Sequence, residues 1–123
     1  MDFEIDGNRF KDFDGFVCEF NRGFIRHVGG DWNGNLDAFH DYLSWADEHC
    51  TFRWCHSEKS RIDLGHAATS RWLAERLIHC HPANKALVQN RLDDANKGLG
   101  PTLFDTLVEI IQDNDQYVEL VLD

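Results

Sequence analysis

The stretch GNLDAFHDYL, residues 34–43, carries the most specific pattern in the chain. Asn35 is a residue type that caps helix N-termini. Apolar residues follow it at the spacing of one helical face: Leu36, Phe39, Leu43 and Ala46. The stretch therefore predicts a helix that begins after Asn35 and buries one side. Asp37 and Asp41 stand four residues apart, so they share another face of that helix.

The residues before this stretch predict a strand and a helix. Phe3 and Ile5 alternate with acids and precede the turn Asp6-Gly7-Asn8, which indicates a short first strand. A first amphipathic helix is then predicted by apolar residues three and four apart: Phe13, Phe16, Val17, Phe20 and Phe24. Gly29-Gly30 ends that region, and residues 31–34 form a loop.

The residues after the stretch predict the rest of an α/β fold. Residues 51–55 are β-prone and form a second strand, and a helical middle follows with helices at 66–79 and 83–96. Pro101 opens a last helix, and residues 117–122 form a terminal strand. The order β-α-α-β-α-α-α-β favours a three-stranded parallel sheet packed by helices, in one domain spanning residues 1–123.

Composition and charge limit the possible partners. Of the 123 residues, 42% are apolar, which is enough for a core, and the net charge is −10. Residues 1–50 carry 11 acids and 4 bases, residues 51–100 carry 5 acids and 8 bases, and residues 101–123 carry 6 acids and no base. Acidic ends repel phosphate, which argues against a nucleic-acid partner. A basic protein is the natural complement, and solubility alone explains the charge equally well.

The sequence also leads us to expect a cytoplasmic protein. Its N-terminus lacks a basic region followed by an apolar run, and no stretch approaches the roughly 20 apolar residues of a membrane helix. We therefore expect the four cysteines to be reduced thiols.

Residues 34–43 resemble the signature of the barstar-like family, the inhibitors of barnase-type ribonucleases. That signature is a loop ending in Gly, then Asn-Leu-Asp-Ala, then a second Asp four residues on. Ile5-Asp6-Gly7 also fits, as do the closing helix and strand, so the resemblance covers residues 3–56 and 101–123. Residues 57–100 are longer than in the small inhibitor by about one helix, which indicates an enlarged branch. The family has two adjacent aromatic residues before the signature, and this chain keeps one of them, Trp32. His40 stands where the family has an aromatic residue between the two Asp residues.

The resemblance implies an immunity or self-protection protein, monomeric when free, that blocks a small basic ribonuclease one to one. It implies no catalysis and no cofactor or metal. Asp41 would enter the catalytic phosphate site and Asp37 the neighbouring region. The loop over the substrate groove would consist of Trp32, Asn33, Gly34 and Asn35. His40 would add to this contact, as would Glu109 or, as a second choice, Asp113 on the last helix.

Apart from the resemblance, Asp41 is the stronger candidate for a functional contact. An acid in the first turn complements the helix dipole, which explains Asp37 locally, whereas Asp41 lies past the range of the dipole. Two alternatives to a contact surface remain open: the acids are solvated surface charges, and Trp32 caps the core. Trp45 lies one position off the core stripe, and we expect it to pack under the loop.

Three rival functions are weighed against the inhibitor. The first is a barstar-fold module that regulates a basic protein other than a nuclease. The second is a zinc site at His49-Cys50 with Cys55-His56, or at residues 79–81, which the absence of any Cys-x-x-Cys disfavours. The third is an enzyme. Adjacent His40 and Asp41 point about 100° apart on a helix, and the chain has no phosphate loop or nucleophile elbow.

Overall fold

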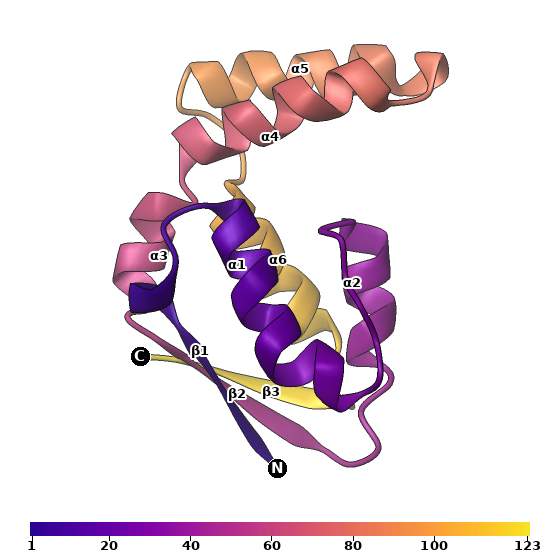
Figure 1. Cartoon of the computed structure of the whole chain (residues 1–123). Helices are drawn as coiled ribbons and strands as arrows, with labels where there is room; N and C mark the ends of the chain where they lie inside the picture. Colours follow the sequence, from indigo (N-terminus) through magenta and orange to yellow (C-terminus); the bar gives the residue numbers. More distant parts are fainter.

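The three strands form one parallel sheet. The structure is a computed structural model that describes residues 1–123, and its strands are β1 (Asp2–Asp6), β2 (Cys50–Cys55) and β3 (Val118–Leu122). Their order is β1-β2-β3, with Phe3 beside Phe52 and Phe52 beside Leu120 (Figure 1). Alternate side chains point to opposite faces, so these three apolar residues all point to one face. The α/β class and the parallel three-stranded sheet are confirmed.

Three helices cover the apolar face of the sheet: α1 (Phe13–Phe20), α2 (Leu36–Leu43) and α6 (Leu103–Asp113) (Figure 1). A π-helical turn, η2 (Asn21–Ile25), continues α1. The core between these helices and the sheet is rich in fully buried aromatic rings, among them Phe16, Phe39, Phe52 and Trp54. Thr102 caps α6 in a capping box with Asp105, so that helix begins where Pro101 indicated.

The expected order of elements is wrong at one place. A short helix, α3 (Ser57–Asp63), follows β2 and makes the order β-α-α-β-α-α-α-α-β. It is attached by polar side chains, since buried Ser60 Oγ accepts a hydrogen bond from Trp54 Nε1 at 2.9 Å. Ser57 Oγ donates to the carbonyl of Asp123 at 2.8 Å.

The helical middle forms a hairpin that projects from the body. It consists of α4 (His66–His79), the 3-10 turn η3 (Pro82–Asn84) and α5 (Lys85–Asn96), which we call the hairpin. The hairpin lies across the ends of α1 and α6 and extends toward the side of α2 (Figure 1). It buries a small apolar cluster of its own: Leu73, Val88 and Ala95. None of the helices has the length and apolar character needed to span a membrane.

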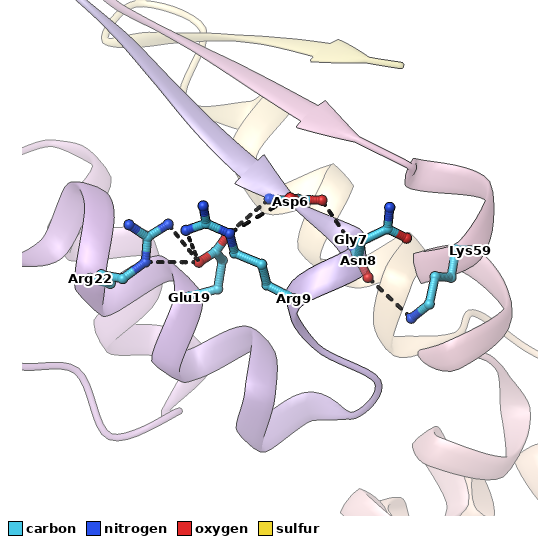
Figure 2. A network of polar contacts seen from close by, with 7 residues as sticks. All are labelled: Asp6, Gly7, Asn8, Arg9, Glu19, Arg22 and Lys59. Atoms are coloured by element: carbon cyan, nitrogen blue, oxygen red, sulfur yellow. Dashed lines mark hydrogen bonds and ion pairs between the residues drawn. The ribbon is translucent and has the colours of Figure 1, made fainter.

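A buried carboxylate ties the N-terminal strand to α1. Glu19 is only 4% exposed at its side chain, and its Oε2 accepts the backbone N–H of Asp6 at 2.9 Å (Figure 2). Its Oε1 accepts two hydrogen bonds from Arg22, at 2.8 and 3.1 Å, and lies 3.9 Å from Arg9 Nη1. Lys59 of α3 donates to the carbonyl of Gly7 in the same region. A buried charge satisfied in this way holds two elements together.

Removing this carboxylate should destabilise the fold. We expect Glu19→Ala to lower the free energy of unfolding by about 1–3 kcal/mol, because the N–H of Asp6 is left without its acceptor. Glu19→Gln keeps an acceptor oxygen and should lose less. Urea denaturation measures both variants. The control is Glu58→Ala, whose exposed pair with Arg61 at 3.4 Å is worth under about 1 kcal/mol. A loss at Glu19 as small as the loss at Glu58 would show that the network adds little stability.

Candidate functional site

The exposed side of α2 carries two acids that have no partner. The Oδ1 of Asn35 accepts the N–H of Ala38 at 3.0 Å, so α2 begins after the predicted cap. Its other side is anchored by buried Phe39 and Leu43. Three exposed residues form what we call the acidic face of α2: Asp37, His40 and Asp41. None of them makes an ion pair, although like charges four residues apart disfavour a helix by about 0.2–0.5 kcal/mol.

The acidic face lines a shallow hollow between α2 and α6. The hollow has a volume of about 270 Å³ and is lined by Leu36, Asp37, His40, Asp41 and Ile110. Two aliphatic side chains therefore lie beside two carboxylates. This composition suits a cationic side chain with an apolar stem, above all arginine, which carboxylates bind in bidentate fashion.

The expectation that Trp32 contacts a partner is wrong. Its side chain is 2% exposed and packs among rings of the core, with the Phe39 ring centroid 4.8 Å away. Its Nε1 donates to the carbonyl of Asn35 at 2.8 Å, so the indole holds the start of α2 from below. An indole has one polar atom and a large apolar area, and here both are satisfied inside the protein. Trp32 therefore positions the loop and is not part of its surface.

The loop before α2 is held in one conformation. Asn21, in the π-helical turn, donates to the Trp32 carbonyl at 2.7 Å and accepts the Trp32 N–H at 2.8 Å. The Oδ1 of Asn33 accepts the N–H of Asn35 at 3.1 Å. Gly34 adopts a φ of +99°, which favours glycine. Asn33 and Asn35 are exposed on this rigid support, and such preorganisation lowers the entropy lost on binding.

Glu109 lies close to the acidic face of α2. It is exposed on α6 and lines a second hollow, of about 410 Å³, together with Leu36. Leu36 also lines the hollow of the acidic face, so the two hollows adjoin. Asp113, the alternative on α6, is exposed and lines neither of them. The structure thus brings Asp37, His40, Asp41 and Glu109 to two adjoining hollows. Asn33, Gly34 and Asn35 line a third hollow, which shares Trp72 with the second.

An exposed aromatic residue lies just after α2, outside the set of residues that the sequence predicts for the site. Trp45 is 49% exposed, so the expectation that it packs under the loop is wrong. Its ring stands edge-on to Tyr42 at 4.7 Å, and the Tyr42 hydroxyl donates to the Asp31 carbonyl at 3.1 Å. Exposed tryptophans are enriched at protein interfaces. Its position one residue off the core stripe was the signal that could have placed it there.

The two cysteines of β2 that are candidate zinc ligands lie apart. Cys50 and Cys55 stand at opposite ends of β2, and Cys50 points to the core face whereas Cys55 points away. Burial raises the pKa of both thiols, and Glu4 adds to the shift at Cys55. Protonated thiols are poor metal ligands. No group of three or more His, Cys, Asp or Glu residues is placed to hold a metal ion.

Comparisons with models of protein families, with curated proteins and with solved structures find no match.

Proposed function

We propose that the chain is a barstar-like inhibitor, an immunity protein that binds a small basic ribonuclease one to one and covers its active site. The observation that carries the proposal is the acidic face of α2, where Asp37 and Asp41 stand unpaired, one helical turn apart. They lie beside a loop that the core holds rigid. The resemblance of residues 34–43 to the barstar-like signature supports the same proposal.

The chemistry of the target explains why carboxylates serve this purpose. A ribonuclease must bind a phosphodiester through Arg, Lys and His side chains. A carboxylate is a compact anion with two oxygens that match the guanidinium group of arginine. Two carboxylates about 5–6 Å apart at their Cβ atoms can occupy two neighbouring anion subsites. Asp41 fills the phosphate site and Asp37 the region next to it.

Competition with a nucleic acid tests whether the active site is covered. The probe is a purified basic ribonuclease of the barnase type, with a 2′-deoxy oligonucleotide that the enzyme binds but cannot cleave. We expect the apparent affinity of the chain for the enzyme to fall as the oligonucleotide concentration rises. An apparent affinity that stays constant at saturating oligonucleotide would place the chain elsewhere on the enzyme and contradict the proposal.

The acidic body should also make association depend on salt. Outside the hairpin the chain carries 19 acids and 8 Lys or Arg residues, which attract a basic partner over long range. The screening length falls from about 10 Å at 0.1 M salt to about 3 Å at 1 M. We expect the association rate constant, measured by stopped flow, to fall roughly tenfold or more over this range. The dissociation rate constant should change much less. An association rate independent of salt would rule out steering by the acids.

A further inference from the structure

The hairpin overhangs the loop and the start of α2, and hollows lie beneath it on both sides of Trp72. One, of about 480 Å³, lies between α1, the loop and α4, and Asn33, Gly34 and Asn35 line it together with Trp72. The other is the hollow of about 410 Å³ lined by Leu36, Glu109 and residues of α4 and α5. Trp72 lines both, and we call the two hollows together the hairpin groove.

We propose that the hairpin is a second partner-binding element, and that the hairpin groove takes an exposed loop of the same basic ribonuclease. The inference rests on the proposed function and adds a second area of the chain that contacts the partner. The loop it takes carries a Lys or Arg side chain next to an apolar one. The alternative occupant is a second copy of this chain, and the experiment below distinguishes it from the ribonuclease.

Continuity with the acidic face of α2 is the first argument. Leu36 lines both the hairpin groove and the hollow that contains Asp37 and Asp41. Asn35 caps α2 and lines the groove on its other side. A protein seated on the acidic face therefore reaches the groove within the same contact, with no gap in the surface between them.

The unpaired acids of the groove are the second argument. Asp14 and Glu75 line the hollow on the α1 side, and Asp94 and Glu109 line the other. None of the four makes an ion pair, and they outnumber Arg76 and Arg91, which line the same hollows. The guanidinium of Arg76 instead lies over the Trp72 ring, 5.0 Å from its centroid. Acids with no internal partner beside an apolar ring complement a basic side chain with an apolar neighbour.

The way the hairpin joins the body is the third argument. It contributes Ala68 to the main core, and Thr69 Oγ1 accepts the N–H of Leu103 at 2.8 Å. Trp72 packs edge-on against Phe13 at 6.3 Å. Beyond Trp72 the hairpin packs on itself and leaves Ile78 and Leu87 74% and 54% exposed. Most of the hairpin therefore packs outside the main core.

Two adjacent acids on α5 give a matched pair of variants. Asp94 lines the hairpin groove, whereas its neighbour Asp93 lines neither of its two hollows and accepts a hydrogen bond from Gln89 at 2.9 Å. Asp94→Lys and Asp93→Lys change the net charge equally and at nearly the same place, so long-range steering changes alike. We expect Asp94→Lys to weaken binding to the purified barnase-type ribonuclease roughly tenfold more than Asp93→Lys does. Titration calorimetry measures both on the full chain, and circular dichroism confirms that both fold.

The outcomes separate this inference from the proposed function. If wild type binds the enzyme, Asp41→Ala weakens that binding strongly and the two lysine variants weaken it equally, the inhibitor stands and the hairpin contact is wrong. If wild type does not bind, both are wrong. Sedimentation velocity tests whether a second copy of this chain occupies the groove instead. A wild-type dimer that only Asp94→Lys dissociates would assign the groove to a second copy and overturn the inference.

Discussion

Asp41→Ala should weaken binding to a basic barnase-type ribonuclease by roughly 30-fold to several thousand-fold. Truncating one partner of a charge pair buried at an interface costs about 2–5 kcal/mol, a range to which barnase complexes themselves contribute. Much of this loss comes from the arginine or lysine of the enzyme, which is left buried without an anion. Asp41 is exposed and unpaired in the free chain, so its removal should leave the free energy of unfolding almost unchanged.

The control for this prediction is Asp2→Ala. Asp2 is exposed on β1 and belongs to the face of the sheet that no helix covers, together with Glu4 and Glu119. That face is also acidic and is the rival surface for a basic partner. Titration calorimetry should show a loss of under about threefold for Asp2→Ala, because only long-range attraction is reduced. Equal, small losses at Asp2 and Asp41 would remove α2 from the interface.

Trp32→Ala should lower the free energy of unfolding by about 3–5 kcal/mol. The indole is 2% exposed among four aromatic rings, and its loss leaves a cavity in the core. The Asn35 carbonyl also loses the N–H that Nε1 donates. Trp32→Phe keeps part of the apolar volume and should lose less stability. It should still weaken partner binding, because the loop and the start of α2 are then less firmly held.

Trp45→Ala is the matched control, since it removes the same side chain from a position that is 49% exposed. We expect urea denaturation to show a loss of under about 1 kcal/mol for Trp45→Ala, well below the loss for Trp32→Ala. A Trp32→Ala variant that unfolds at the wild-type urea midpoint, yet no longer binds the enzyme, would return Trp32 to the contact surface.

Much of the fold could be predicted because its signals are local. The apolar period of α2, the cap Asn35 and the alternation of the short strands each follow from a few neighbouring residues. Helix α3 gave no such signal. Its only large apolar residue, Ile62, is 79% exposed, and the helix is held by buried Ser57 and Ser60. Such hydrogen bonds to Trp54 and to the distant Asp123 leave no period in the sequence.

In the candidate site, too, some features follow from the local sequence and others depend on tertiary packing. The shared face of Asp37 and Asp41 follows from helical spacing alone, and the structure keeps both exposed. Whether the Trp32 side chain points inward or outward could not be predicted from the adjacent residues in the sequence. It depends on the hydrogen bond from Asn21 and on packing against the aromatic rings of α1. The hairpin groove depends on where α4 and α5 lie above α2, and only tertiary packing sets that placement.

One titration tests the central proposal most directly. A fixed concentration of a purified basic barnase-type ribonuclease is mixed with increasing amounts of the chain, and cleavage of RNA is followed by the rise in absorbance. The proposal predicts that cleavage falls to zero as the chain reaches one equivalent, and that Asp41→Ala shifts the curve to far higher concentrations. Full cleavage in the presence of excess wild-type chain would contradict it.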